Sequence, residues 1–306
     1  MEPAASLEQP EVGVRPTVML RSTSEHRSSN ANEVKDGPRD PCDPCTIREV
    51  WASNLDAEFD VIMHLVQKYN YVAVDTEFPG VLVTPSDQLQ PSLYQYSLVR
   101  DNVNLMKLVQ LGFSFFDENG QRAPECCAWQ FNFKFNVEED AAAEDSIRFL
   151  RESGIQFDKH QRHGIDPNKF AERCTISGVV LSDTVKCLVF HGAYDFGYLL
   201  KVLTGQDLPE KESDFFELLG LYFPAIYDVK CIMNDCPGLW GGLQNVANNL
   251  EVARVGSQHQ AGSDSLLTGA VFFRMQQVYF AGRMDDKYSG QVSGLGGVNF
   301  RPHSSP

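Results

Sequence analysis

The sequence predicts an α/β domain in which helices cover a central sheet. Short runs of β-branched and aromatic residues, typical of buried strands, alternate along the chain with amphipathic segments of helical spacing. The chain has 306 residues, of which 42% are hydrophobic, and this proportion is enough to bury a core. No internal repeat is visible.

The first half of the domain is predicted to contain helices followed by three strands. Apolar residues recur every three or four positions between residues 46 and 70, which predicts one or two helices with Asp56 as a cap. The run YVAVDTEF at 71–78 is short, apolar and β-branched, and it predicts a buried strand. Two further strands are predicted at 108–120 and 127–135.

Helices and strands alternate through the second half. Turn residues and changes of hydrophobic period mark the boundaries of each element. The predicted helices are 138–154, 170–181, 194–205, 212–224, 241–252 and 263–280, and the predicted strands are 186–192 and 225–233.

One folded domain is predicted between two tails. Residues 1–44 are rich in Ser, Pro, Glu and Asn without hydrophobic periodicity, a composition that predicts disorder. Residues 45–286 carry all the predicted elements and form the single domain. Residues 287–306 are rich in Gly and Ser and predict a flexible tail.

The sequence predicts an intracellular protein. It has no run of about 18 apolar residues that could span a membrane, and its first residues lack the pattern of a secretory signal. Its eight cysteines are too few for a disulfide framework, so we expect thiols. Cys42 and Cys45 form a CxxC pattern without a second Cys or His pair nearby, and we expect no zinc site there.

The acidic balance excludes one class of nucleic-acid binder. The formal net charge is −15, and residues 1–45 hold eight acids and five bases, so −12 belongs to the remainder of the chain. The electrostatic field of so acidic a chain repels a polyanion. We therefore expect no broadly basic surface that binds nucleic acid through its phosphates.

A pair of carboxylates closes the first buried strand. Asp75 and Glu77 are two residues apart, so their side chains point to the same face of the strand. Two acids this close repel each other unless a proton or cation compensates them, and hard divalent ions prefer carboxylate oxygens. Two solvated acids at the end of the strand are the alternative.

Two later segments add acids and a histidine. Asp195 lies at a strand-to-helix junction, where it is either a helix cap or a ligand. Asp264 lies in the first turns of the last helix, and His259 precedes it by five residues. If that helix includes His259, a rise of about 1.5 Å per residue places the imidazole above the carboxylate. The alternative is a surface histidine and a capping Asp.

The order of these motifs resembles the DEDD superfamily of 3′-to-5′ exonucleases, in its histidine-containing branch. The strings DTEFPG, QFNFKFN, HGAYDFGYLL, GGLQ and HQAGSDSLLTG more narrowly resemble the Pop/Caf family, the deadenylase subunit of the Ccr-Not complex. The resemblance extends from about residue 47 to about residue 286. It implies an RNase H-like fold, with a mixed central sheet flanked by helices.

The resemblance also implies the site. Two divalent ions are expected, Mg²⁺ by preference and Mn²⁺ as a substitute, because the ligands are all oxygens. His259 is expected to position or deprotonate the attacking water. From its position directly after the acidic pair, Phe78 is expected to emerge beside the site and stack on the terminal base, and a buried core Phe is the alternative. The expected ligands are Asp75, Glu77, Asp195 and Asp264.

The implied activity is the removal of poly(A) tails from the 3′ end of single-stranded messenger RNA. The implied partners are the scaffold and the leucine-rich-repeat nuclease of the complex, in the cytoplasm and nucleus. An exonuclease of other RNA or DNA is one alternative. A docking subunit with vestigial catalysis is another, although all five motif positions are intact. Neither composition nor spacing distinguishes adenine from other bases.

Overall fold

The computed structural model describes residues 46–85, 91–123 and 128–295. The chain divides into two units, Met1–Cys42 and Asp43–Pro306, and all the described residues belong to the second. The predicted disordered tail at 1–44, with Cys42 and Cys45, lies outside the described residues. So does 296–306, the last part of the chain.

A six-stranded mixed sheet forms the centre, with strand order β1-β4-β3-β2-β5-β6. The central strand β2 is antiparallel to β3 and parallel to β5, and β1 is parallel to β4. The strands are β1 (Ile47–Val50), β2 (Tyr71–Glu77), β3 (Gln110–Phe116), β4 (Ala128–Asn132), β5 (Lys186–Val189) and β6 (Ala225–Asp228). The predicted mixed sheet is confirmed.

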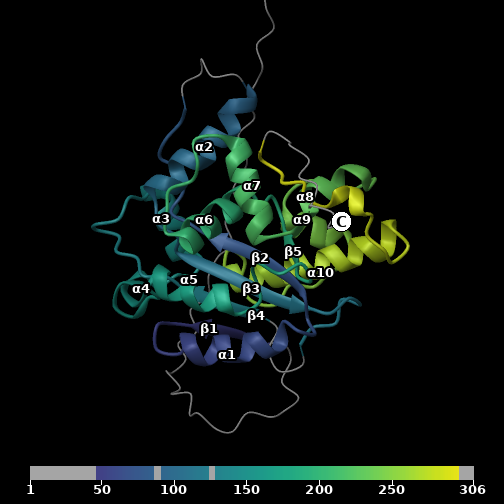
Figure 1. Ribbon diagram of the computed structural model, residues 1–306, viewed down its shortest axis with the longest axis horizontal. Helices are drawn as coiled ribbons and strands as arrows, with labels where there is room; N and C mark the ends of the chain where they lie inside the picture. Colours follow the sequence, from purple (N-terminus) through teal and green to yellow (C-terminus); the bar gives the residue numbers. More distant parts are fainter. Residues whose placement is uncertain (1–45, 86–90, 124–127, 296–306) are drawn as a thin grey trace, which may run out of the picture. The chain divides into compact units, whose positions relative to one another are not determined.

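Helices cover both faces of this sheet (Figure 1). They are α1 (Leu55–Leu65), α2 (Pro91–Leu105), α3 (Glu144–Glu152), α4 (Phe157–His163), α5 (Pro167–Ile176), α6 (Ala193–Thr204), α7 (Glu212–Tyr222), α8 (Val229–Ile232), α9 (Leu243–Asn249) and α10 (Ala261–Tyr279).

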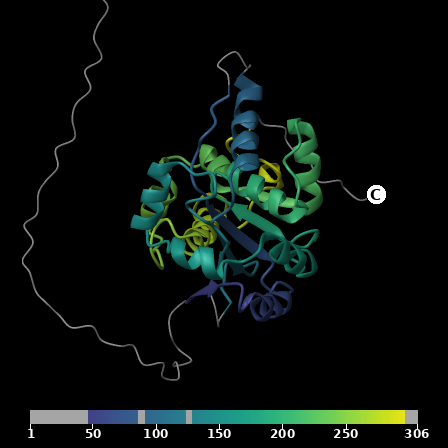
Figure 2. The same cartoon turned by 90° about the vertical axis from the view of Figure 1, so that its left-hand side faces the viewer.

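The side chains of β2 point alternately to the two faces of the sheet, and the core is divided into two layers accordingly. Val72 and Val74 pack in one cluster with residues of α1, α5, α6 and α7. Tyr71 and Ala73, which point to the opposite face, pack in a second cluster with residues of α8, α9 and α10. Figure 2 shows α10 (yellow) nearly end-on. Side chains of opposite parity on β2 therefore meet different helices.

Tertiary pairing overrides two of the local predictions. Residues 47–50 form an edge strand rather than a helix, because they pair in register with β4. The strand predicted at 225–233 ends at Asp228, whose carboxylate accepts a hydrogen bond from the amide of Lys230 and caps α8. Helices α2 and α4 were not predicted.

Other predicted helices have different boundaries. The one at 138–154 begins only at Glu144. The one at 170–181 begins at Pro167, where Asp166 supplies the cap, and ends at Ile176. The remaining helices and strands lie within a few residues of their predicted limits.

The flexible tail predicted from residue 287 is wrong for residues 287–295. Tyr288 and Val292 are buried, and Ser289 forms an isolated bridge with Tyr227. Apolar residues spaced among the glycines supply this packing, which the overall Gly and Ser content conceals. No helix in the described ranges has the length and apolar character needed to cross a bilayer.

Candidate active site

Two carboxylates and one hydroxyl at the end of β2 point to opposite faces of the sheet. Asp75 and Glu77 share the parity of Ala73 and face α10, whereas Thr76 faces the layer that contains α6. Both acids are partly accessible through a cavity but are surrounded by protein. The expected same-face geometry of the pair is therefore present.

The start of α10 lies against the sheet because Gly112 leaves room for it. Gly112 on β3 pairs with Asp75, and a Cβ atom at Gly112 would lie 1.9 Å from the carbonyl oxygen of Ala261. The helix consequently places Asp264 beside the end of β2. Asp264 is buried, and its Oδ2 accepts a hydrogen bond of 3.2 Å from the Gln260 amide, so it also stabilises the start of the helix.

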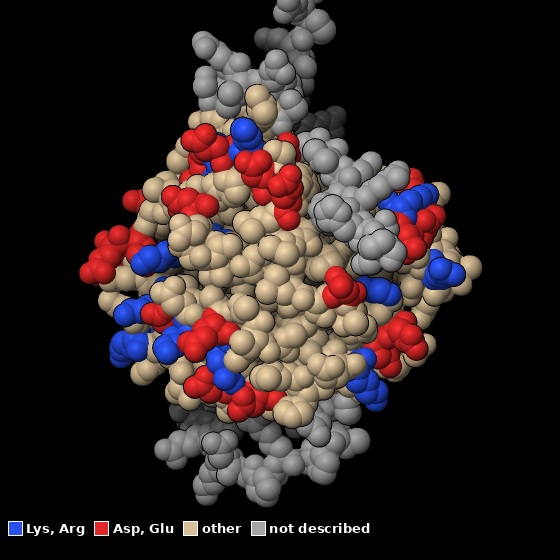
Figure 3. Space-filling view, viewed as in Figure 1, with Lys and Arg blue, Asp and Glu red and all other residues tan. Residues whose placement is uncertain are grey.

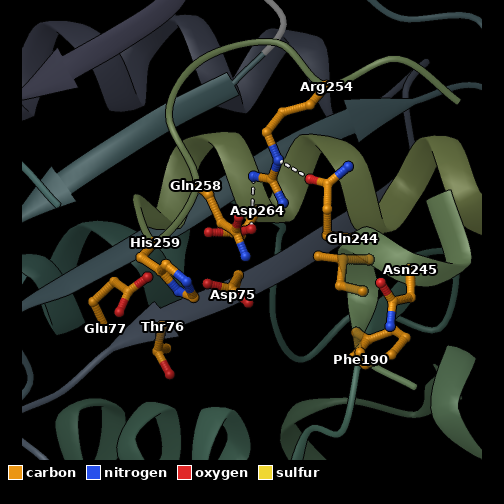
Figure 4. Close-up of a pocket in the computed structure, with 12 residues that line it drawn as sticks. Asp75, Thr76, Glu77, Phe190, Gln244, Asn245, Arg254, Gln258, His259 and Asp264 are labelled. Carbon is orange, nitrogen blue, oxygen red and sulfur yellow. Dashed lines mark hydrogen bonds and ion pairs between the residues drawn. The ribbon is translucent and has the colours of Figure 1, made fainter. Parts of the chain in front are cut away.

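These side chains line a cavity of about 450 Å³ (Figure 4). Potential ligand atoms of Glu77, His259 and Asp264 all lie within 4.8 Å of one another. Asp75 lies beside them on the same wall. The cavity is lined by Asp75, Thr76, Glu77, Phe190, Gly242, Leu243, Gln244, Asn245, Arg254, Gln258, His259 and Asp264.

Asp195 reaches the same strand from the other side. It lies in the first turn of α6, is 7% exposed, and accepts a hydrogen bond of 2.6 Å from the hydroxyl of Thr76. Gly192, not Asp195, is the N-cap of this helix. Asp195 does not line the cavity, so the structure brings together three of the four predicted ligands there and holds the fourth behind Thr76.

The site accumulates negative charge that the protein only partly compensates. Burial, with repulsion from Asp264 and Asp195, raises the pKa of Glu77 to about 8. Burial also raises the pKa of Asp195 to about 7, although the hydrogen bond from Thr76 opposes the increase. Burial and three neighbouring carboxylates raise the pKa of Asp75 well above its usual value. Buried acids with such pKa values are typical of functional sites.

Arg254 was not predicted from the sequence, and it is the one Lys or Arg lining this cavity in the described part of the chain. Its guanidinium lies 2.7 Å from the Asp264 carboxylate, and it donates hydrogen bonds to Gln244 and Ser263. It lies outside any periodic pattern, so no sequence signal pointed to it. Arg254 fixes the position of Asp264 and lowers the pKa of Asp75.

His259 lies in the loop before α10, because the helix begins only at Ala261. The condition that the helix includes His259 is therefore not met, in agreement with the predicted helix at 263–280. His259 adopts φ +60°, an uncommon conformation for a residue with a side chain. Its ring lies edge-on to Phe149 of α3, with 4.6 Å between the ring centroids. The histidine nevertheless reaches Glu77 and Asp264.

Phe78 does not line the cavity. Its ring stacks on Tyr194 at 4.8 Å and lies 5.1 Å from Tyr198. Among the described residues, the Phe that lines the cavity is instead Phe190, which follows β5 and was not predicted from the sequence. Phe190 comes directly after the carboxyl end of β5, and residues at such ends commonly reach a site at the edge of the sheet.

Comparison with known proteins identifies relatives over most of the domain. The chain is 48% identical over 265 residues to "Probable CCR4-associated factor 1 homolog 7" of Arabidopsis thaliana, covering 84% of this chain and 96% of the relative. It is 45% identical to "Poly(A) ribonuclease pop2" of Schizosaccharomyces pombe, covering 82% of this chain and 75% of the relative.

Solved structures agree in fold. The S. pombe Pop2p structure in its Mg²⁺- and Mn²⁺-bound form matches with a TM-score of 0.79 and 45% identity, covering 81% of this chain and 99% of that one. A chain from the structure of the yeast NOT1 MIF4G domain co-crystallized with CAF1 matches with a TM-score of 0.70 and 32% identity, covering 81% and 96%.

The family model for the CAF1 family ribonuclease matches residues 50–173 and 175–272. These ranges include every residue of the acidic cluster described above, from Asp75 on β2 to Asp264 on α10. The predicted exonuclease fold is confirmed by the Pop2p match. The chain belongs to the CAF1 family of ribonucleases.

Proposed function

We propose that this protein is a metal-dependent 3′-to-5′ exoribonuclease that shortens poly(A) tails. One observation carries the proposal: Asp75, Glu77 and Asp264 converge with His259 in one cavity, and the first two carboxyls have raised pKa values. Such a cluster requires a cation or protons for stability. The activity in the name of the S. pombe relative supports the choice of substrate.

The donor set fits divalent ions. All four proposed ligands, Asp75, Glu77, Asp195 and Asp264, offer carboxylate oxygens, which suit Mg²⁺ and Mn²⁺. The related Pop2p structure contains both of these metals. Two ions bound there would activate water and stabilise the charge on a leaving 3′ oxygen.

The remaining residues have supporting roles in this proposal. His259 accepts the proton of the attacking water, since histidine exchanges protons near neutral pH. Thr76 holds the Asp195 carboxylate by the 2.6 Å hydrogen bond, and Arg254 holds Asp264. The terminal base is accommodated on the side of the cavity that contains Phe190. Phe78 packs on Tyr194 and has no direct role in this proposal.

The proposed assembly is a Ccr-Not complex in the cytoplasm and nucleus. Co-crystallization of yeast CAF1 with the NOT1 MIF4G domain supports a scaffold partner. The description of the Arabidopsis relative as a CCR4-associated factor supports a second nuclease as partner. We expect these partners to recruit substrate, because an acidic chain attracts RNA weakly.

The test compares the wild-type protein with Asp75→Ala on a labelled RNA ending in twenty adenosines, with saturating Mg²⁺. We expect stepwise shortening from the 3′ end by the wild type and a loss of at least about a thousandfold in the variant, because a metal ligand is removed. Asp183→Ala is the matched control, since Asp183 is exposed and lies outside the cavity.

The same assay distinguishes the alternatives. Equal rates on poly(A), poly(U) and single-stranded DNA would replace the deadenylase with a general exonuclease. An inactive wild type would favour a docking subunit with vestigial catalysis. Retained shortening by Asp75→Ala would contradict the proposed two-ion chemistry.

A further inference from the structure

A second hollow, at the C-terminal end of α3, is lined by cations. It has a volume of about 510 Å³ and lies between the end of α3 and helix α4. Its charged lining residues are Arg151, Lys159, Arg162 and Asp158. Figure 3 shows Lys and Arg side chains over α4, at the left of the view, with Asp and Glu side chains beside them. Three cations and one acid give this hollow a charge opposite to the −15 of the chain.

The acid compensates little of this positive charge. Asp158 lies 3.7 Å from Arg162, and the two side chains are 90% and 69% exposed. Exposed pairs of this kind interact weakly and are screened by salt. Among the ion pairs of the described ranges none includes Arg151 or Lys159, although Lys159 interacts electrostatically with Glu49 and lowers the pKa of that carboxyl.

Aromatic rings hold two of the cations in place. The Lys159 ammonium lies 4.1 Å from the centre of the Trp51 ring, and the Arg151 guanidinium lies 5.7 Å from that of Phe157. A cation held over a ring loses conformational freedom while its N–H groups stay available to an anion. The hollow is therefore better prepared for phosphate than three free surface side chains would be.

The hollow adjoins the active site through the end of α3. Gln260, the residue after His259, donates a 2.8 Å hydrogen bond to the carbonyl of Ser153. Ser153 is two residues from Ile155, which lines the hollow. On α3 itself, Phe149 contacts His259 and is 45% exposed. Phe149 and Arg151 lie two residues apart on α3, about 3 Å along the helix axis, so the last turns of this helix connect the cavity to the hollow.

We propose that this basic hollow binds phosphates of the RNA strand on the 5′ side of the nucleotide in the active site. The inference rests on the proposed exoribonuclease function. A polyanionic substrate needs local positive charge on a protein that is acidic as a whole, and the hollow supplies it. Basic grooves have the same role in other proteins that bind single strands. Affinity should then increase with RNA length.

The test is the triple variant Arg151→Gln/Lys159→Gln/Arg162→Gln in the full chain. For a 20-residue oligo(A) we expect kcat/KM to fall about tenfold, and for a trimer less than about twofold, because the trimer does not reach the hollow. The plot of log affinity against log salt should become shallower by about 2, since each lost contact to a single strand contributes about 0.7.

The matched control is Lys68→Gln/Lys211→Gln/Arg283→Gln, which removes the same charge from exposed residues elsewhere. An equal fall of kcat/KM in the two triple variants would show that only the net charge of the protein matters, and would overturn the proposed site. An equal loss on the trimer and the 20-mer would also overturn it.

Binding of fluorescent 20-residue oligo(A), measured by anisotropy in EDTA, separates this inference from the enzymatic proposal. Weaker binding by the triple variant than by the control supports the hollow even if the wild type hydrolyses no RNA. Unchanged RNA affinity would overturn the inference and leave an acidic protein partner as the better occupant of the hollow.

Discussion

His259 combines an uncommon backbone conformation with a proposed chemical role. At φ +60° the backbone of any residue with a Cβ is strained unless its surroundings fix it. Here the fixing contacts are the ring of Phe149 and the hydrogen bonds of Gln260 to neighbouring elements. Replacing His259 by Ala would therefore change the strain and the imidazole together.

His259→Asn separates these two effects, because Asn tolerates positive φ better than Ala. We expect kcat to fall about a hundredfold or more, as for the loss of a general base. The melting temperature and the affinity for Mg²⁺ should change little. His259→Ala should lose as much activity and also about 1 kcal/mol of unfolding free energy. An unaltered rate in both variants would remove His259 from the mechanism.

The sequence predicted the chemistry of the site better than its contacts. Asp75 and Glu77 could be paired because a strand repeats every two residues. The approach of Asp195 from behind Thr76 depends on which helix packs on which face, and a single sequence does not state this. Arg254 and Phe190 were missed because their importance comes only from three-dimensional proximity to the acids.

At the scale of elements, the contact between α10 and the sheet determines where Asp264 lies. Small residues on both sides of this contact allow a close approach. A Cβ at Gly112 would clash with the backbone of α10, as described above. A Cβ at Gly269 on the helix would likewise lie 2.1 Å from the ring of Phe116. The ring is a side chain, but the obstacle at Gly112 is backbone and has little freedom to move.

Gly112→Ala should therefore displace the start of α10. We expect a loss of about 3 kcal/mol in unfolding free energy, typical of an overpacked core, with reduced activity below the melting temperature. Gly242→Ala is the control for stability alone, because Gly242 has negative φ and no atom within 4 Å of the added Cβ but lines the cavity. Chemical denaturation measures both. Equal stability of the two variants would contradict the tight contact.

Helices and strands were predicted correctly where the local sequence pattern determines the structure. They were predicted wrongly where pairing with a distant strand determines it. The run at 71–78 contains consecutive β-branched and apolar residues and forms β2 as predicted. Residues 47–50 have helical spacing but pair with β4, which lies about eighty residues later in the chain. Tyr288 and Val292 pack on the domain although their neighbours are mainly Gly and Ser.

At the scale of the whole molecule, the buried acids link stability to pH. Glu77 and Asp195 have pKa values of about 8 and 7 in the folded protein, whereas carboxyls in unfolded chains titrate near 4. Between these limits the folded state binds more protons than the unfolded state. The free energy of unfolding of the metal-free protein therefore falls as pH rises from about 4 to about 8.

We expect the melting temperature in EDTA to be roughly 5 °C lower at pH 8 than at pH 6. Mg²⁺ binds the ionised carboxylates, so its stabilising effect should be larger at pH 8. Glu77→Gln removes the group with the higher of the two stated pKa values. The melting temperature of this variant should therefore depend less on pH. Thermal unfolding at both pH values measures this. An equal Mg²⁺ effect at both pH values would contradict the linkage.

The wide separation of the site residues along the chain has a consequence for synthesis on the ribosome. Thr76 and Asp195 are 119 residues apart, and Asp264 comes later still, on the final long helix. A nascent chain that has emerged only as far as residue 260 contains all six strands of the sheet but lacks Asp264. It also lacks the helix that covers one face of the central strands. Nuclease activity therefore begins only after Asp264 and the rest of α10 have emerged, and no shorter nascent chain holds the complete site.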